Sequence, residues 1–474
     1  MTIESARLKS RIADLAPEFE QRLGALFALA SVSMDPGRHA EMDACATLAG
    51  DYLREAGARV DVIATGGFPI VLGRIIQNPS FPTITVYNHL DVQPADARDG
   101  WDQASPFELT RKGETKSGAA RWFARGATDD KGPALTALYG ARLALEQGVR
   151  ANIQFLWELE EEIGSPHFAA GLAAAVAGDA AAGRAPFATD SVVVSDTIWT
   201  AAGKPSISYG LRGLMGFTIA LETGVKDVHS GTTGGLARNP IGELSALLAE
   251  MYDARTGRVR IPGFYEDVAK LSALERKAAS RAGFTRKGFR AAHELHSLRP
   301  VPNDLAGLIA LTAAPTLEVH GIVGGYSGPG IKTIVPHRAE AKLSTRLVPD
   351  QEPAKVFNLI KRFVKKRLPD AVVTHEASLA PYLAPLGGSY NEAAAAAMRA
   401  TFGKVPAFVR EGGSIGAVLT MRKLLKAPVL FLGLSLPEHG YHAVNENFDW
   451  GQASGGMEMF CRYFNEIADT AHKG

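Results

Sequence analysis

The sequence has very little cysteine and no excess of charge of either sign. Of its 474 residues only Cys45 and Cys461 are cysteines, so neither a disulfide scaffold nor a zinc site built on several cysteines is expected. Fifty-one Lys and Arg residues balance 50 Asp and Glu residues, which leaves no overall basic surface for nucleic acid or anionic lipid. Histidine and carboxylate side chains must therefore bind any metal ion.

Long hydrophobic runs and targeting signals are also lacking. Residues Met1 to Arg7 contain no basic segment followed by an apolar stretch, so we expect no secretory signal. The Ala-rich stretch around Ala174 is interrupted by Asp179 and Arg184, which argues against a membrane span of about 18 apolar residues. Hydrophobic residues still make up 46% of the chain, enough for a large core. These features predict a soluble, cytoplasmic protein.

Short apolar runs alternate with helical patterns over the first part of the chain. Strands are predicted at 83–87, 153–157 and 191–194, with helices at 132–147 and 168–177 between them. This alternation is typical of an α/β domain, in which a mixed, largely parallel sheet is flanked by helices.

A different pattern begins near residue 210 and ends near Pro385. It has alternating strands, a charged stretch that we expect to be a solvated helical excursion, and a basic amphipathic helix: 213–222, 317–324, 334–348, 265–297 and 352–368. The first pattern then returns, with a buried strand at 428–432 and helices before and after it. This order predicts a discontinuous catalytic domain, residues 1–211 and 385–474, interrupted by an inserted α+β lid or dimerisation domain, residues 212–384.

Ionisable residues follow three of the predicted central strands. His89 and Asp91 follow the first, residues 160–162 (all Glu) the second, and Asp196 the third. In an open α/β sheet, ligands bind beyond the carboxyl ends of the strands, so these side chains are expected to converge. Several carboxylates in one place repel one another unless a cation neutralises them. Because Zn²⁺ accepts His nitrogen and carboxylate oxygen, the pattern predicts a metal site suited to hydrolysis.

Two other segments carry candidate ligands. Residues 126–132, Gly-Ala-Thr-Asp-Asp-Lys-Gly, precede a predicted helix and would alone be an ordinary turn with a helix N-cap. Residues 439–446, His-Gly-Tyr-His-Ala-Val-Asn-Glu, follow the strand that ends near Leu434 and supply two more histidines. Either histidine alone would be an ordinary loop residue.

Together these motifs resemble those of the M20 family of metallopeptidases, which includes carnosinase-like dipeptidases, carboxypeptidase G2-like enzymes, and acetylornithine and succinyl-diaminopimelate deacylases. The resemblance covers nearly the whole chain. The matching segments occur in the family's order: His89-x-Asp91, Gly-x-x-Asp129-Asp-Lys-Gly, Glu161-Glu162-x-Gly164-Ser165, Asp196, and His442 before Asn445-Glu446, with Asp227-Val-His229-Ser-Gly in the insertion.

The resemblance implies two Zn²⁺ ions per chain, and cobalt or manganese would suit the same donors. Asp129 would bridge the two ions and be joined to the next residue by a cis peptide bond. Asp91 would orient the imidazole of His89. Gly164-Ser165 sets the register of the Glu run, so Glu161 would be the general base and Glu160 is left over. The implied metal ligands are His89, Asp129, Glu162, Asp196 and His442.

The resemblance also implies a homodimer with shared active sites. His229 of the inserted domain would reach the site of the partner subunit, bind substrate there and stabilise the oxyanion. The positions that match the family's substrate-binding residues, including an arginine suited to a carboxylate, are Arg346, Thr333 and Ser414. The chain departs from the carnosinase-like pattern at Tyr441, where a small residue is usual, and His439 could compete as a ligand or contact substrate.

These features predict a di-zinc hydrolase that cleaves the amide bond of a dipeptide or small peptide with a free C-terminal carboxylate. An N-acyl-amino-acid deacylase with the same metal chemistry is the alternative. A catalytically inactive binding relative is disfavoured, because Glu161 and all five candidate ligands are present. No nucleic-acid or membrane partner is expected.

Overall fold

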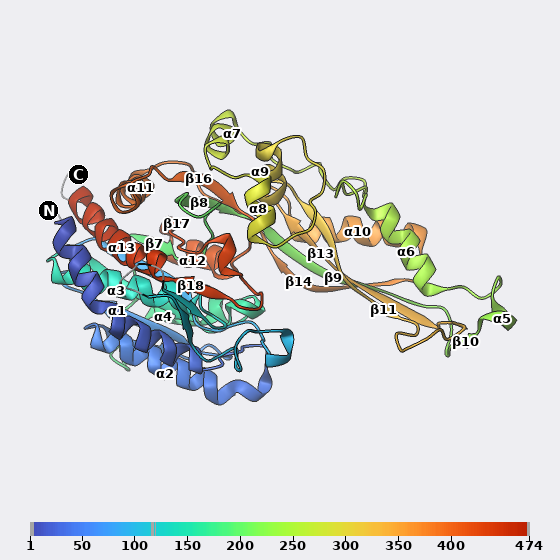
Figure 1. Ribbon diagram of the computed structural model, residues 1–474, viewed down its shortest axis with the longest axis horizontal. Helices are drawn as coiled ribbons and strands as arrows, with labels where there is room; N and C mark the ends of the chain where they lie inside the picture. The colour runs from blue at the N-terminus through green and yellow to red at the C-terminus, as the bar shows by residue number, and fades with distance from the viewer. Residues whose placement is uncertain (1–3, 115–117, 119, 472–474) are drawn as a thin grey trace.

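The computed structural model describes residues 4–114, 118 and 120–471. Two principal sheets, of nine and four strands, organise these residues, and two small sheets accompany them. Figure 1 shows the larger body on the left, with both chain termini, and the smaller sheet extending to the right. The predicted α/β class with a second, smaller α+β unit is confirmed.

The nine-stranded sheet is parallel in its centre, and its outer pairs are antiparallel except for one outer strand that pairs in parallel. The two central strands, β3 (Thr83–His89) and β6 (Asn152–Glu158), have seven residues each. All of these residues are buried except Thr83, which is half-buried, and this suits a sheet covered on both faces. The strands lie in the order β1 (Arg59–Ile63), β2 (Ile70–Ile75), β6 (Asn152–Glu158), β3 (Thr83–His89), β7 (Ser191–Val194), β17 (Val429–Phe431), β8 (Ser206–Leu211) and β15 (Tyr382–Leu383), with β16 (Ala407–Glu411) also beside β8.

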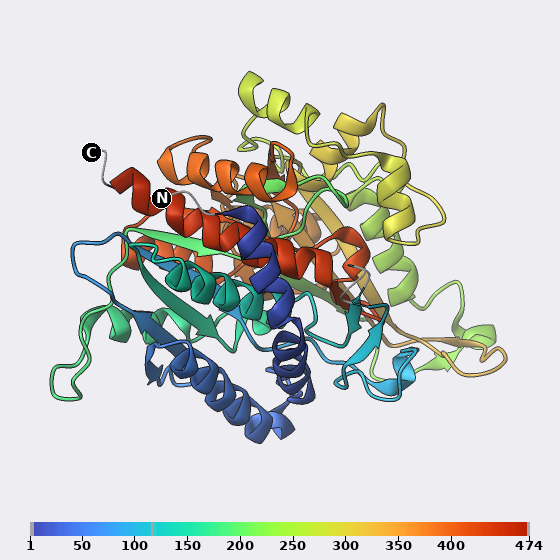
Figure 2. The same cartoon turned by 60° about the vertical axis from the view of Figure 1, so that its left-hand side comes forward.

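Helices cover both faces of this sheet. The core on one face joins β2, β3 and β6 to α1 (Ser5–Ala28), α2 (His39–Glu55), α3 (Lys131–Glu146), α11 (Ser389–Phe402) and α13 (Trp450–Ala471). The other face packs against α4 (Phe168–Ala177) and α12 (Ala417–Leu425). Figure 2 shows the first and last helices side by side, and Phe19 contacts Trp450 there. Of the helices in the described part of the chain, none is long and apolar enough to cross a membrane.

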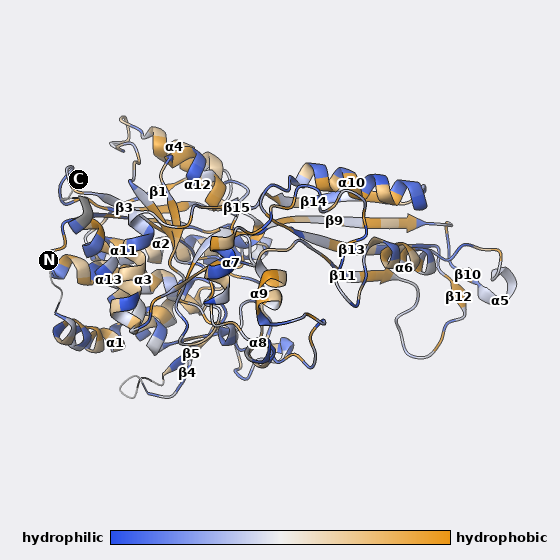
Figure 3. Cartoon of the chain, turned by 90° about the horizontal axis from the view of Figure 1, so that it is seen from above, coloured by the Kyte–Doolittle hydropathy of each residue, from blue (hydrophilic) through white to orange (hydrophobic). Residues whose placement is uncertain are grey.

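The four-stranded sheet is antiparallel and buries one face. Along β9 every second side chain is buried, as the alternation of apolar residues predicted. Its core includes residues of α6 (Pro240–Met251) and α10 (Pro353–Arg367), and Figure 3 shows α10 banded in hydrophilic and hydrophobic colours. The strands lie in the order β11 (Thr316–Gly324), β13 (Arg338–Leu347), β9 (Gly213–Glu222) and β14 (Val372–Leu379).

Short elements lie at the ends of these sheets. A two-stranded sheet and α5 (Ser230–Thr233) lie at the far tip of the smaller unit in Figure 1. The strands are β10 (Val228–His229) and β12 (Ile334–Val335), and a three-stranded sheet in the larger body contains β18 (Asn447–Asp449), β5 (Arg121–Phe123) and β4 (Thr110–Lys112).

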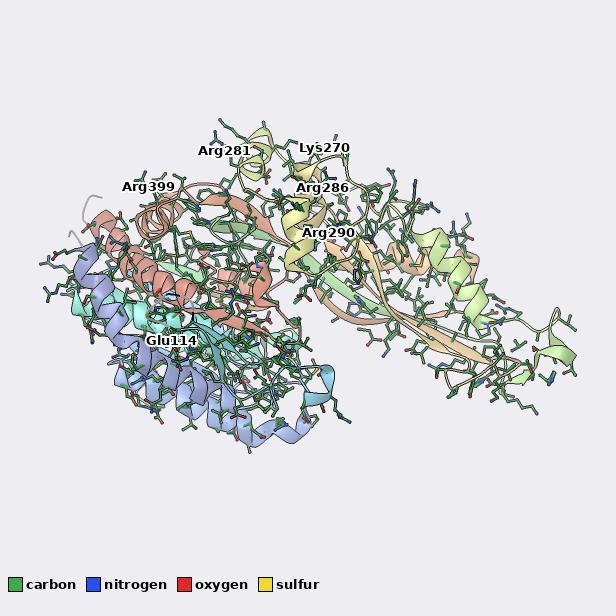
Figure 4. The ribbon with its side chains drawn as sticks, in the orientation of Figure 1. Glu114, Lys270, Arg281, Arg286, Arg290 and Arg399 are labelled. Atoms are coloured by element: carbon green, nitrogen blue, oxygen red, sulfur yellow. The ribbon has the colours of Figure 1, made fainter. Side chains whose placement is uncertain are left out.

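The charged stretch at 265–297 contains two short helices, α7 (Ala273–Ser280) and α8 (Arg286–Ala292), and α9 (Asp304–Thr312) follows it. From here on, the charged excursion means all three helices. The exposed Lys270, Arg281 and Arg290 lie along it (Figure 4). Its inner side is apolar, because Ala282 and Leu308 pack with Val409 of β16. The excursion is therefore attached to the larger body as well as inserted in the sequence of the smaller one.

The chain leaves the large sheet after Leu211 and returns to it at Tyr382. These two residues are register partners on the antiparallel strands β8 and β15, so both connections lie side by side. The predicted division at 212–384 follows this route closely, and the division into two domains stays a prediction.

Candidate metal centre and active site

Three neighbouring parallel strands bring acids and a histidine to one edge of the large sheet. β6, β3 and β7 are adjacent, and each ends where the chain enters a polar segment. His89 is the last residue of β3, Glu161 and Glu162 form a 3-10 turn (η4, Glu161–Ile163) after β6, and Asp196 follows β7. The side chains that follow these three strands therefore converge at one edge of the sheet, as predicted.

One group of metal-ligating atoms consists of His89, Asp129 and Asp196, all buried. His89 Nε2 lies 3.0 Å from Asp129 Oδ1 and 3.9 Å from Asp196 Oδ2. One ligand atom from each residue lies within 4.8 Å of the others. An imidazole and two carboxylates at this spacing could hold a divalent cation.

A second group shares Asp129 with the first. His442 Nε2 lies 2.9 Å from the other carboxylate oxygen of Asp129 and 3.3 Å from Glu162 Oε2. These three residues also meet within 4.8 Å. Because the two oxygens of Asp129 face different groups, this carboxylate is placed to bridge two ions, and all five predicted ligands are brought together.

Asp91 supports both groups without belonging to either. Its two carboxylate oxygens accept the backbone N–H groups of Glu161 and Glu162, at 3.1 and 3.0 Å. The Nδ1 atom of His89 lies 3.0 Å from the backbone carbonyl of Asp91 and 3.4 Å from its carboxylate. The contacts of Asp91 therefore hold the imidazole of His89 and also the turn that follows β6.

The turn at residues 126–132 holds Asp129 in place. A cis peptide bond joins Asp129 to Asp130, as the resemblance implied. Asp130 occupies the N-cap position of α3, as expected for a turn before a helix, but its side chain makes no capping hydrogen bond to that helix. It instead accepts hydrogen bonds from the Asn88 amide at 2.7 Å and from the His89 backbone at 3.3 Å, which ties the turn to β3.

Glu446 is the main support of this turn from the C-terminal side. Its buried carboxylate accepts the backbone N–H groups of Gly126, Thr128 and Asp129, at 3.0, 2.9 and 3.1 Å. It also pairs with Arg125 at 2.8 Å. Sequence reasoning named Glu446 only as part of a motif, because no local pattern shows that it contacts a turn more than 300 residues earlier.

The electrostatics of the site call for added positive charge. Burial raises the pKa of Asp196 to about 7, and burial with the neighbouring carboxylates raises the pKa of Glu161 well above its usual value. Burial alone would lower the pKa of His442, but hydrogen bonds with Asp129 and Glu162 raise it to about 11. Divalent cations among these oxygen and nitrogen donors would balance the charge of the carboxylates. The donor set fits two Zn²⁺ ions.

The two glutamates at the start of the Glu run face different surroundings. The carboxylate of Glu160 accepts the backbone N–H of Phe68 at 2.9 Å and lies 3.0 Å from His167 Nδ1, away from the metal-ligating groups. Glu161 instead lies close enough to Arg346 for its charge to raise the pKa of that arginine. The charges of Asp196 and Asp129 in turn raise the pKa of Glu161. This arrangement supports the register in which Glu161 faces the site.

The segment before His442 holds His439 and Tyr441, whose roles the sequence did not determine. Both nitrogens of the buried His439 are occupied, by Asp449 at 2.8 Å and by Thr128 and the Leu436 backbone at 3.1 Å, so His439 is not available as a ligand. The Tyr441 hydroxyl lies 3.1 Å from Ser435 Oγ and 3.5 Å from Asp196 Oδ1, so its one proton can be donated to either acceptor. Tyr441, a departure from the family pattern, therefore lies beside a candidate ligand.

Arg346 and Ser414 lie together beside the metal-ligating groups. Arg346 Nη1 donates to Ser414 Oγ at 2.8 Å, and Ser414 donates in turn to the backbone carbonyl of Arg212 at 2.6 Å. Burial, with the charge of Arg346, lowers the pKa of Arg212 to about 10. In the described part of the chain, neither arginine forms an ion pair with a carboxylate. Arg212 was missed, because nothing in its sequence neighbourhood distinguishes it from a surface arginine.

His229 and Thr333 are not brought to the metal-ligating groups of their own chain. His229 is the last residue of β10, and the backbone of Thr333 accepts a hydrogen bond from Ser230 beside it at 3.0 Å. Figure 1 shows β10 and α5 at the tip of the smaller unit, far from β7 and β18. Within one chain the candidate site contains Arg346 and Ser414 but lacks these two residues.

Comparison with known proteins identifies the family of the chain. The model of peptidase family M20/M25/M40 matches residues 85–466. The Cys-Gly metallodipeptidase dug1 of Schizosaccharomyces pombe is 31% identical over 96% of each chain, and the human Beta-Ala-His dipeptidase is 31% identical over 95% of this chain and 90% of its own. The crystal structure of human carnosine dipeptidase 1 superimposes with a TM-score of 0.85 at 29% identity, covering 98% of both chains.

Proposed function

Because the chain belongs to peptidase family M20/M25/M40, it is a metallopeptidase, and we propose that it is a di-zinc dipeptidase acting on peptides with a free C-terminal carboxylate. The observation that carries this proposal is the shared carboxylate of Asp129, which joins the two metal-ligating groups. The similarity to a Cys-Gly metallodipeptidase and to a Beta-Ala-His dipeptidase over nearly the full length favours dipeptides as substrates.

Two groups of side chains would hold the metal ions. His89, Asp129 and Asp196 would bind one ion, and Asp129, Glu162 and His442 the other. When bound, divalent cations supply Lewis acidity, which lowers the pKa of water and polarises the amide carbonyl. Zinc is favoured by the mixture of imidazole and carboxylate, and cobalt or manganese would fit the same donors.

Glu161 would move the protons of the reaction. Its carboxylate, on the turn that follows β6, would accept a proton from the attacking water. It would then give this proton to the nitrogen of the departing amine. Arg346 would bind the substrate carboxylate through its planar guanidinium, held in orientation by Ser414.

The site would be completed by a second subunit. His229 and Thr333 lie at the tip of the smaller unit, so a symmetric homodimer could place them over the partner's metal centre. There His229 would stabilise the oxyanion and Thr333 would contact the substrate. Mixing a Glu161→Gln chain with a His229→Ala chain tests this: each alone should be inactive, and each mixed dimer should regain one complete site. No recovery after verified subunit exchange would contradict it.

A substrate panel tests the activity itself. The zinc-loaded protein is incubated with Cys-Gly, β-Ala-His and Ala-Gly and, separately, with N-acetyl and N-succinyl amino acids, and amino acid release is measured. Release from the unmodified dipeptides is expected. Rapid deacylation without turnover of any dipeptide would replace the proposal with a deacylase, and no turnover of any compound would indicate an inactive relative. The cytoplasmic location stays a prediction.

A further inference from the structure

A second cavity lies between the charged excursion and the edge of the large sheet. It has a volume of about 220 Å³ and is lined mainly by apolar side chains. Helices α8 and α9 form one wall and the segments around Trp199 and β16 form the other; Figure 1 shows these helices above the larger body. We call it the aromatic cavity, and its apolar wall includes Ile198, Trp199, Phe284, Phe289, Leu308 and Leu311.

The aromatic wall is held in place by specific contacts. Trp199 is buried, and its indole N–H donates to the Gly433 carbonyl at 2.8 Å. The rings of Phe284 and Phe289 are 5.7 Å apart, and Phe289 lies 4.4 Å from the ring of His293. Such packing gives the cavity a fixed shape before any ligand binds.

The aromatic cavity adjoins the proposed active site through three segments. Ile198 follows the candidate ligand Asp196 by two residues, and its backbone N–H donates to Glu411 at 3.4 Å. Glu411 is close enough to Asp196 for their charges to interact. Gly412 and Gly413, also in the wall, lead directly to Ser414, and α8 packs against η5 (Pro437–His439) just before His442.

Resting on the proposed dipeptidase activity, we propose that the aromatic cavity binds the apolar side chain of the residue on the amino side of the scissile bond. The cavity is smaller than the roughly 300–1,000 Å³ of sites that hold a whole small molecule, so it suits one side chain. The carboxylate of the other residue is assigned to Arg346 and Ser414, and the carboxylate of Glu411 in the wall would repel it. Leucine, methionine and phenylalanine are the expected occupants.

The test compares dipeptides that differ at one end only. With the zinc-loaded protein, kcat/KM for Leu-Gly and Phe-Gly should exceed that for Gly-Gly at least about tenfold, the scale expected for filling an apolar pocket. Gly-Leu should gain no comparable advantage over Gly-Gly. Leu311→Trp, which fills the cavity, and Phe289→Ala, which widens it, should each lower the Leu-Gly to Gly-Gly ratio about tenfold. Lys287→Ala, on the exposed side of α8, should leave the ratio unchanged.

Binding gives a readout that does not need turnover. Calorimetry with the zinc-loaded Glu161→Gln variant should show tighter binding of Leu-Gly than of Gly-Gly, and Leu311→Trp or Phe289→Ala added to that variant should remove the difference. A preference that follows the C-terminal residue, or cavity variants that affect all dipeptides equally, would overturn the assignment of the cavity. Selective binding without hydrolysis of any dipeptide by the wild type would support the cavity and overturn the proposed activity.

Discussion

The carboxylate of Asp91 accepts a hydrogen bond from the backbone N–H of Glu161, at 3.1 Å. Its second oxygen accepts the N–H of Glu162, and its backbone carbonyl lies beside the ring of His89. One buried residue thus positions the proposed base and one ligand from each metal-ligating group. A displacement of Asp91 would therefore disturb both metal-ligating groups and the proposed base together.

Asp91→Asn should weaken metal binding and turnover together. An Asn side chain has one acceptor oxygen, so at least one of the N–H groups of Glu161 and Glu162 would lose its partner. Substitution of a residue that orients metal ligands in this way lowers metal affinity or activity about 10- to 100-fold. Zinc titration and kcat/KM measure the two effects, with the exposed Asp51→Asn on α2 as control. Unchanged zinc affinity in Asp91→Asn would show that the hydrogen bonds do not orient the ligands.

Glu161→Gln should abolish turnover while leaving the metal content intact. Glutamine keeps the shape of the side chain but cannot accept the proton, and loss of a general base costs about 10²- to 10⁴-fold. Kinetics and metal analysis of the same sample give the result. Glu160→Gln is the matched control, because its carboxylate binds Phe68 and His167 instead. Loss of activity in Glu160→Gln with normal activity in Glu161→Gln would show that the register of the Glu run is wrong.

The ends of the central strands were predictable from sequence, and the supports of the site were not. The apolar runs at 83–87 and 191–194 end next to His89 and Asp196, so a short pattern places both residues at the same edge. Glu446 and Arg212 act through contacts with segments far along the chain, which only the fold creates. The pattern of the first 75 residues, helix, helix and strand, predicts one strand, whereas the structure has two there, β1 and β2.

His439 shows why residue type alone does not identify a ligand. It lies three residues from His442 in a segment with suitable chemistry, yet its ring is buried between Thr128 and Asp449. The local sequence does not determine which way a loop side chain points. That orientation decides whether the side chain binds a metal or supports the fold.

Removal of metal should lower thermal stability as well as activity. Without cations the buried carboxylates must be protonated or repel one another, as the raised pKa of Asp196 indicates. A metal at a free concentration 100-fold above its Kd stabilises the folded state by about 2.7 kcal/mol. Calorimetry should show a fall in Tm with chelator and recovery with zinc, and Asp129→Asn should respond much less. An unchanged Tm of the wild type after verified removal of metal would contradict this.

Asp449→Asn should destabilise the protein at neutral pH and much less in acid. Burial alone would raise the pKa of Asp449, but the hydrogen bond from His439 and the charge of that ring hold it below the usual 3.8. A lowered pKa in the folded state adds stability above the unfolded pKa, and this stability is lost as the pH falls below about 3.8. At pH 7 the variant should lose about 1–3 kcal/mol of unfolding free energy.

Urea unfolding at pH 7 and at pH 3.5 measures the difference between wild type and Asp449→Asn. The difference should shrink at the lower pH, because the unfolded wild-type chain then binds a proton at this carboxylate more readily than the folded protein does. An equal difference at both values would show that the Asp449–His439 pair is not responsible. Asp51→Asn again serves as the exposed control.

The buried ammonium of Lys131, at the start of α3, donates to the backbone carbonyls of Leu26 and Leu29, at 2.9 and 2.8 Å. These carbonyls lie at the C-terminal end of α1, a helix that carries no candidate ligand. A shortened chain that begins after Leu29 would leave a buried cation without these acceptors, two residues from Asp129. We therefore expect metal binding to need the first helix, which an expression fragment limited to the matched family region, residues 85–466, would lack.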